Sequence, residues 1–125
     1  MIGRREFVGV AALGLLAGCA SPRIGKETME EMYGLIGQMK VADGKRGEVI
    51  AAMLAGTRDM PGNIAYMIAE DLDDPNSIWI TEVWQTKTDH ANSLQLPGVQ
   101  EAIGKARAHI TGFGTRVETK PIVRG

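Results

Sequence analysis

Glu82 is the residue of this sequence that most needs a chemical explanation, because it is a carboxylic acid within a strongly apolar stretch. The run Ile78–Trp84 is rich in aromatic and β-branched residues and therefore predicts a strand. Because side chains alternate across a strand, one face carries Glu82 with Trp84, and the other carries Trp79 with Val83. Both faces are apolar enough to be covered, and an isolated buried carboxylate is energetically costly. We therefore expect Glu82 to be paired, protonated or beside a wet cavity.

Other side chains could work with Glu82 on a bound molecule. His90 lies in the first turn of a predicted short helix and Leu94 follows one turn later on the same face, so His90 should point inward beside Trp84. The N-terminal end of a helix favours neutral imidazole, which can serve as a base or an acceptor. Tyr66 shares a predicted strand face with apolar neighbours and could line a pocket.

Each of these residues also has a purely structural interpretation. Trp84 could be a core aromatic residue, and Glu82 could be a structural acid paired with an arginine such as Arg58 or Arg107. His90 could merely cap a helix, and a half-buried strand tyrosine often serves packing alone. The residue types therefore leave a functional and a structural interpretation open.

The elements that must position these side chains follow from hydrophobic periodicity and from turn residues. The pattern predicts strands at residues 33–41, 63–71, 78–84 and 115–122, and helices at residues 45–57, 86–94 and 99–109. Thr86 and Asp89 form an approximate capping box at the short helix, and Gly112-Phe113-Gly114 is expected to close the last helix. This order predicts an α+β, ferredoxin-like split β-α-β fold, with an antiparallel sheet and helices on one face.

The face of the sheet away from the helices should be polar if it meets water. Trp79, Thr81 and Val83 lie on that face of the central strand and are poorly suited to solvent. The simplest cover for such a face is a second copy of the same sheet. We therefore expect a homodimer.

The N-terminal segment is expected to lie outside this fold. Residues 1–18 read as a secretory signal: Arg4-Arg5-Glu6-Phe7 resembles a twin-arginine (Tat) export motif, and Leu16-Ala17-Gly18-Cys19 resembles a lipobox. Cys19 is then the lipidated first residue, residues 19–32 form a tether, residues 33–122 form the domain, and residues 123–125 form a tail. The predicted location is exported and membrane-anchored on the extracytoplasmic side, facing the periplasm in a Gram-negative cell. The alternatives are an unlipidated secreted protein and a chance match to the lipobox.

Composition excludes several other classes of function. The 125 residues include 14 basic and 15 acidic side chains, so the net charge is −1, and no basic patch interleaved with aromatic residues suggests a nucleic-acid partner. Cys19 is the single cysteine, which rules out an intramolecular disulfide and argues against thiolate catalysis or a cysteine-ligated metal.

The stretch Ile80–Trp84, the turn Met60-Pro61-Gly62 and the order of elements resemble the antibiotic biosynthesis monooxygenase (ABM) family, near its quinol monooxygenase branch. The resemblance covers about Tyr33 to Ile122. It implies a dimeric α+β barrel with a pocket between sheet and helices in each subunit. Characterised members oxidise quinols or electron-rich polycyclic aromatics with molecular oxygen, without metal or flavin, and some relatives bind and break down haem.

The resemblance also suggests roles for individual residues. Glu82 and Trp84 match the family's Glu-x-Trp pattern, which implies that Trp84 is a pocket wall and hydrogen-bond donor and that Glu82 is a polar group of the pocket. Many members carry a helix histidine farther along, where this chain has Ser93 and Leu94, so His90 departs from the pattern. The expected catalytic residues are Glu82, Trp84 and His90, and the expected substrate-binding residues are Tyr66, Ile80 and Leu94.

The function expected from these features is a cofactor-independent monooxygenase that oxidises a quinol or another electron-rich aromatic with molecular oxygen. The alternative is a non-catalytic, membrane-tethered dimeric domain that binds a small aromatic or quinone-like ligand. Haem degradation is a third interpretation, and the displaced position of His90 disfavours it. No metal and no cofactor are expected.

Overall fold

The computed structural model describes residues 31–122. The expected signal peptide, the lipidation site Cys19, nearly all of the tether and the C-terminal tail lie outside these described residues and stay predictions. Within residues 31–122, no helix is long and apolar enough to cross a membrane.

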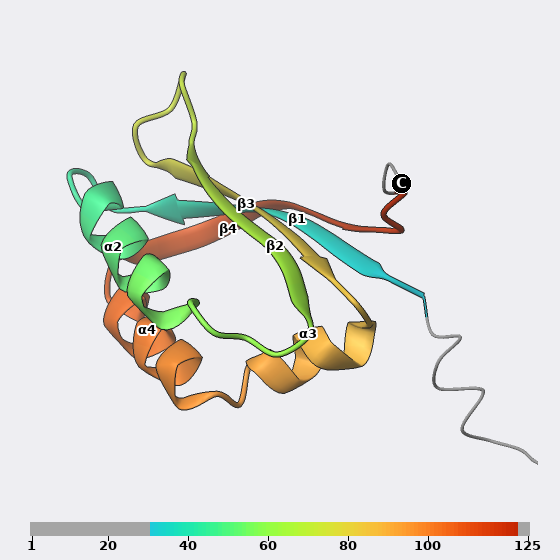
Figure 1. Cartoon of the computed structure of the whole chain (residues 1–125). Helices are drawn as coiled ribbons and strands as arrows, with labels where there is room; N and C mark the ends of the chain where they lie inside the picture. Colours follow the sequence, from blue (N-terminus) through green and yellow to red (C-terminus); the bar gives the residue numbers. More distant parts are fainter. Residues whose placement is uncertain (1–30, 123–125) are drawn as a thin grey trace, which may run out of the picture. The chain divides into compact units, whose positions relative to one another are not determined.

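The domain is one four-stranded antiparallel sheet with three helices on one of its faces (Figure 1). In chain order the elements are β1 (Tyr33–Val41), α2 (Arg46–Gly56), β2 (Asn63–Glu70), β3 (Ser77–Trp84), α3 (Lys87–Ser93), α4 (Pro97–Arg107) and β4 (Ile110–Thr119). The strands lie in the order β2-β3-β1-β4, so β3 and β1 are central. The predicted α+β, ferredoxin-like fold is confirmed.

The turns use the residues that their backbone conformations require. Gly44 before α2 and Gly62 before β2 both have positive φ angles, of 75° and 82°, which glycine adopts without a steric cost. Thr86 caps α3 as expected, because its side-chain oxygen accepts a hydrogen bond from the backbone N–H of Asp89. This short helix is therefore fixed directly after the strand that carries Glu82.

The last third of the chain differs from the sequence prediction. Helix α4 already begins at Pro97, which is tolerated in the first turn because its missing N–H has no partner there. The expectation that Gly112-Phe113-Gly114 closes a helix is wrong, because these residues lie within β4, which begins at Ile110. Ile110 continues the helical spacing of α4 but pairs with Val41 of β1, and two register shifts in this ladder accommodate the irregular strand.

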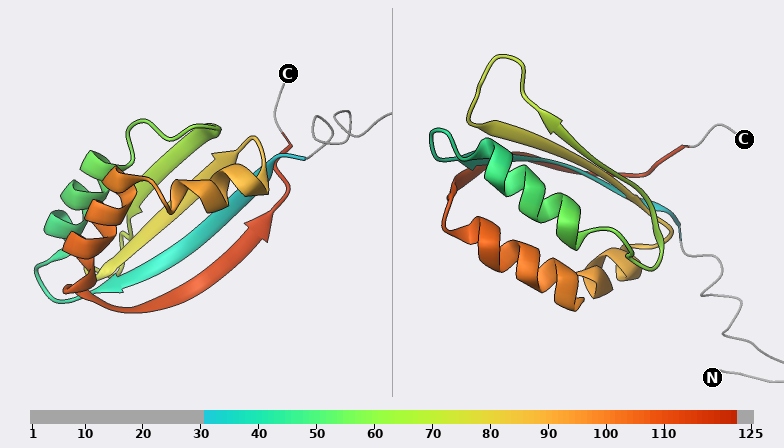
Figure 2. Two further views of the ribbon diagram at one scale, coloured as in Figure 1. Left: turned by 90° about the horizontal axis from the view of Figure 1, so that it is seen from below. Right: turned by 60° about the vertical axis from the view of Figure 1, so that its left-hand side comes forward.

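Two hydrophobic clusters fill the space between the sheet and the helices. One cluster joins β1, α2, β3 and α4 and contains Val41, Val49, Met53, Ile78, Ile80 and Ala106. The other lies toward α3 and contains Tyr33, Leu35, Met60, Trp84 and Val99. Figure 2 shows α2, α3 and α4 on the same side of the sheet, with β4 at one edge.

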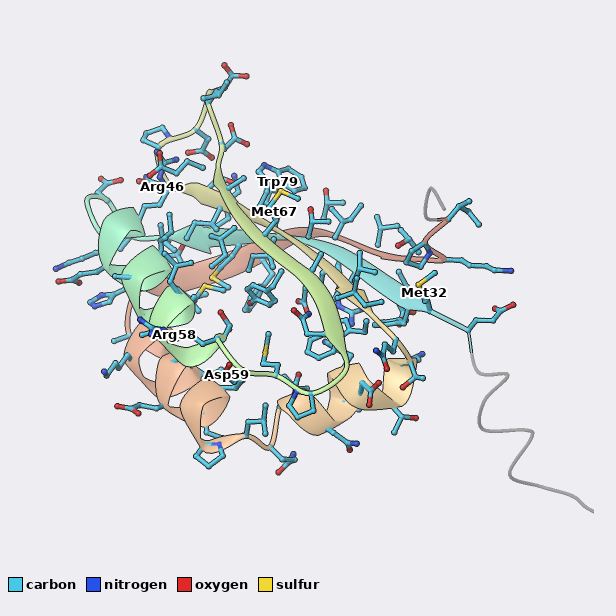
Figure 3. All side chains as sticks on the ribbon, viewed as in Figure 1. Met32, Arg46, Arg58, Asp59, Met67 and Trp79 are labelled. Carbon is cyan, nitrogen blue, oxygen red and sulfur yellow. The ribbon has the colours of Figure 1, made fainter. Side chains whose placement is uncertain are left out.

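The opposite face of the sheet is covered by no element among residues 31–122. The pairing register aligns four of its residues in one row across all four strands: Met67, Thr81, Ile36 and Val117. Met67 is 60% exposed and Val117 is 45% exposed. Figure 3 shows Met67 and Trp79 on this side of the sheet, away from the helices. We refer to these five residues as the open-face patch.

Candidate active site

The strand register builds the candidate site from two cross-strand rows on the helix-facing side of the sheet. One row contains Tyr66, Glu82, Leu35 and Glu118, each on a different strand. The next row contains Ile68, Ile80, Gly37 and Arg116. An acid on one central strand thus lies near an arginine on the edge strand, and Gly37 separates them without a side chain.

Glu82 is held by two neighbours that follow it closely in the sequence. The indole Nε1–H of Trp84 donates a hydrogen bond of 2.9 Å to Oε1 of Glu82, and Nε2 of His90 lies 3.8 Å from the same oxygen. The Glu82 side chain is only 13% exposed. Burial raises the pKa of Glu82 above its ordinary value, and the bond from Trp84 and the charges of His90 and Arg116 only partly oppose this effect.

The proposed structural pairing of Glu82 with Arg58 or Arg107 is wrong. Both arginines are exposed, and neither forms an ion pair with Glu82. Arg116 is the arginine whose charge acts on Glu82. Sequence reasoning missed it because it lies on β4, far along the chain.

Aromatic rings enclose His90 on two sides. Its ring centroid lies 5.4 Å from that of Tyr33 and 5.7 Å from that of Trp84, the latter in an edge-on arrangement. The hydroxyl of Tyr33 donates to Glu118 Oε2 at 2.7 Å, and Nζ of Lys87 lies 3.3 Å from the same oxygen. This network ties α3 to β1 and β4 and fixes the imidazole beside Glu82.

A cavity of about 170 Å³ opens next to Glu82. Its walls include Glu82, Ile80, Arg116 and Phe113, and Gly37 contributes to its floor. A Cβ atom added at Gly37 would meet nothing within 4 Å, so the missing side chain leaves real space. The cavity therefore combines an acid, a cation and apolar surface.

A second cavity of about 300 Å³ lies between α2, α4 and the sheet. It shares Met39 and Phe113 with the first cavity, so the two adjoin. Its lining is almost wholly apolar, and Tyr66 is a polar exception. The hydroxyl of Tyr66 forms no hydrogen bond with another residue of the described range, and burial together with the negative charge of Glu82 raises the pKa of Tyr66. A bound oxygen atom could accept its proton.

The structure brings most of the predicted site residues together. Glu82 and Ile80 line the smaller cavity and Tyr66 lines the larger one. Trp84 and His90 surround Glu82 but line neither cavity, and Trp84 has no exposed surface. Leu94 is the C-cap residue of α3, is 42% exposed and also lines neither cavity.

The structure adds three residues that the sequence analysis did not single out as site residues. They are Gly37, Arg116 and Tyr33. Gly37 has no side chain that would point to a site, and the other two depend on the pairing of β1 with β4, which no local pattern reveals.

The described residues give no group of three His, Cys, Asp or Glu side chains arranged to hold a metal ion. His90 has a 15% exposed side chain, packed between two aromatic rings and not over either cavity. It is therefore not positioned as an axial ligand above these cavities.

Comparison with known proteins agrees with this architecture. Residues 32–105 match the antibiotic biosynthesis monooxygenase family. No curated protein sequence matches the chain. The chain is similar to the crystal structure of a candidate antibiotic biosynthesis monooxygenase from Chloroflexus aurantiacus J-10-fl, with 43% identity and a TM-score of 0.73 over 76% of this chain and 97% of that chain.

Two further solved structures, both of candidate antibiotic biosynthesis monooxygenases, support the fold alone. The one from Nitrosomonas europaea has 20% identity and a TM-score of 0.60 over 73% of this chain and 88% of that chain. The one from Bordetella bronchiseptica has 13% identity and a TM-score of 0.63 over 75% and 100%, respectively. The match of residues 32–105, with the 43% identity to the Chloroflexus protein, shows that this chain belongs to the antibiotic biosynthesis monooxygenase family.

Proposed function

We propose that this protein is a monooxygenase that oxidises a quinol or another electron-rich hydroxy-aromatic compound with molecular oxygen. Its family supports the monooxygenase activity. The observation that carries the proposal is the position of Glu82, an acid with little solvent contact on the wall of one cavity and beside a larger apolar one. Such an acid can take the proton of a bound hydroxyl group.

The substrate must become easy to oxidise before it can react. Molecular oxygen is a triplet and reacts slowly with closed-shell molecules, whereas a phenolate readily gives up an electron. Glu82 removes a hydroxyl proton from the quinol, and the resulting phenolate reduces oxygen. One oxygen atom then replaces a ring hydrogen as a hydroxyl group, and the other leaves as water. The quinol becomes a hydroxyquinone and supplies all four electrons, so the reaction needs no separate reductant.

The surrounding side chains favour this proton transfer. The raised pKa of Glu82 makes it a stronger base than an ordinary carboxylate, and the hydrogen bond from Trp84 fixes the orientation of its carboxylate. Tyr66 can donate to the phenolate oxygen from the adjoining cavity. The Glu82 side chain is itself largely shielded from water, which strengthens these interactions.

The test is oxygen consumption by the purified, metal-stripped protein with a panel of quinols. We expect uptake above autoxidation in the wild type, and about a hundredfold lower catalysed rate in Glu82→Gln, because a general base contributes roughly that factor or more. His90→Ala should lose less. Glu101→Gln, which changes an exposed acid of α4 paired with Lys105, is the control and should keep the full rate. Wild-type uptake equal to the blank would refute the proposal.

A second candidate function is binding without catalysis. The larger cavity favours it, because an apolar cavity of about 300 Å³ can hold a small aromatic or quinone-like ligand without any reaction. The hydroxyl of Tyr66, which has no hydrogen-bond partner within residues 31–122, could bind a polar group of that ligand. Stoichiometric ligand binding with oxygen uptake at the blank rate would support this function.

We further propose that the protein is a homodimer joined through the open-face patch and that Cys19 anchors it to a membrane. The apolar row across the sheet supports the dimer. The lipobox-like sequence supports the anchor, which would bring the pocket close to lipophilic quinols.

A further inference from the structure

We infer that the pocket selects an aromatic hydroxy acid, whose hydroxyl group meets Glu82 and whose carboxylate meets Arg116. This inference names the substrate class and rests on the proposed function, because the hydroxyl at Glu82 is the group to be deprotonated. It identifies Arg116 as the residue that determines specificity. A neutral quinol would leave that cation without a partner on the ligand.

The first support is the placement of the two charged residues on one cavity. Glu82 lies on β3 and Arg116 on β4, and both line the smaller cavity. Their strands are separated by β1 alone, so the backbones lie roughly 10 Å apart across the sheet. That separation leaves room for a flat ring system with a polar group at each end.

The second support is the charge balance around Arg116. Within residues 31–122 no carboxylate forms an ion pair with Arg116, and its guanidinium acts on the hydroxyl of Tyr33. The neighbouring Glu118 is contacted by Tyr33 and Lys87. The charge of Arg116 still lowers the pKa of Glu118 and opposes the rise at Glu82. Its guanidinium can therefore receive a ligand carboxylate, the acceptor that its planar donors match best.

The third support is the floor between the two residues. Gly37 pairs with Ile80 on one side and with Arg116 on the other, and open space lies where its side chain would be. Apolar groups of Leu35, Met39 and Phe113 complete the walls. A flat aromatic ring over Gly37 would thus contact carbon atoms along its length. Its two ends would meet the polar groups of Glu82 and Arg116.

The same geometry gives each polar group of a hydroxy acid its own partner. A carboxylic acid on an aromatic ring is ionised at neutral pH and needs a cation, whereas its phenolic hydroxyl is still protonated and needs a base. Arg116 supplies the cation and Glu82 supplies the base. After proton transfer Glu82 is neutral, so the new phenolate does not meet a second negative charge there.

The test compares two matched probes by calorimetry: a hydroxynaphthoate and the naphthol that lacks only the carboxylate. The proteins are the wild type, Arg116→Gln, Arg116→Lys and Arg107→Gln, an exposed arginine of α4 that lines neither cavity. We expect the wild type to bind the acid about 10- to 100-fold more tightly than the naphthol, the usual range for a charge-assisted contact. Arg116→Gln should lose this preference, Arg116→Lys should keep part of it, and Arg107→Gln should keep all of it.

Several outcomes would overturn the inference: equal affinity of the wild type for both probes, an undiminished preference in Arg116→Gln, or no binding of either probe. Circular dichroism of each variant confirms that it is folded. Oxygen uptake with a dihydroxynaphthoate is measured separately. Tighter binding of the hydroxynaphthoate without oxygen uptake would support the binding role of Arg116 and count against the oxygenase. Oxygen uptake without that binding preference would support the oxygenase and count against the binding role of Arg116.

Discussion

At the scale of single residues, the site consists of an acid kept from water and three groups that set its proton affinity. Burial is the strongest influence on Glu82 and raises its pKa, while Trp84, His90 and Arg116 limit the rise. The pKa of Glu82 is therefore raised, which makes the carboxylate more basic, but its neighbours still favour the ionised form. Such a perturbed acid on a cavity wall is typical of a functional site.

The raised pKa of Glu82 makes the stability of the protein depend on pH. Because the pKa of Glu82 is higher in the folded state, the folded protein holds this proton more tightly than the unfolded chain does. The contribution of Glu82 to the free energy of unfolding is therefore largest at acid pH, and it falls as the pH rises from the ordinary glutamate range through the raised pKa.

We predict that Glu82→Gln is more stable than the wild type at neutral pH and that this advantage disappears at acid pH. The glutamine keeps an oxygen that can accept the bond from Trp84 but carries no charge to desolvate. Urea denaturation at a series of pH values measures the difference. Glu101→Gln, in an exposed ion pair, should show no comparable pH trend. An advantage that is absent at neutral pH would contradict the desolvated state of Glu82.

The residues that sequence reasoning identified are those that local structure brings together. Glu82, Trp84 and His90 lie within one strand and the helix that follows it, so alternation and helix periodicity were enough to predict that they meet. Tyr33 and Arg116 come from opposite ends of the domain. Their position depends on the register between β1 and β4, and that register contains two shifts that no local pattern encodes.

At the scale of elements, glycine decides how closely α2 and α4 pack. A Cβ atom added at Gly56 would lie 2.5 Å from the backbone oxygen of Gly98 and 2.6 Å from Cβ of Ala102. The two helices therefore approach each other at a point where no side chain fits. By contrast, Gly104 on α4 has open space around it.

We predict opposite effects for the same substitution at these two positions. Gly56→Ala should destabilise the protein by about 1–3 kcal/mol, because it overpacks a backbone contact. Gly104→Ala should stabilise it by about 0.5–1 kcal/mol, because alanine lowers the entropy of the unfolded chain and favours the helix. Chemical denaturation measures both. If Gly56→Ala were neutral, the close packing of α2 on α4 would be wrong.

The error in predicting β4 also belongs to this scale. The spacing of Ala102, Ala106 and Ile110 fits a helix face, and the glycines after it are typical of a helix end. Tertiary pairing overrides this pattern: β1 offers an unpaired edge, and residues from Ile110 onward pair with it. Glycine in β4 weakens strand propensity, which is why the strand start was placed too late.

At the scale of the whole molecule, the sheet has one face packed against helices and another that carries the open-face patch. A row of Met67, Thr81, Ile36 and Val117 spans all four strands without a charge. Exposed apolar rows of this extent mark interfaces, and a sheet face that meets its own copy about a two-fold axis is self-complementary. The cavities beside Glu82 and Tyr66 lie on the opposite face, so the proposed dimer interface and the proposed ligand site use different sides of the sheet.

We predict that Thr81→Lys converts the proposed dimer to a folded monomer. Thr81 occupies a central strand in the row, so two lysines from the two copies would be buried close together at the interface, and buried unpaired charges are strongly destabilising. Sedimentation velocity measures the mass, and circular dichroism checks the fold. Leu54→Lys places the same charge at an exposed apolar residue of α2, on the helix side, and should remain dimeric. A wild-type monomer, or a dimer that persists in Thr81→Lys, would show that the sheet face is not the interface.

Because the pocket faces the helices, the Thr81→Lys monomer should still bind its aromatic ligand. Loss of binding would mean that the second subunit supports the site.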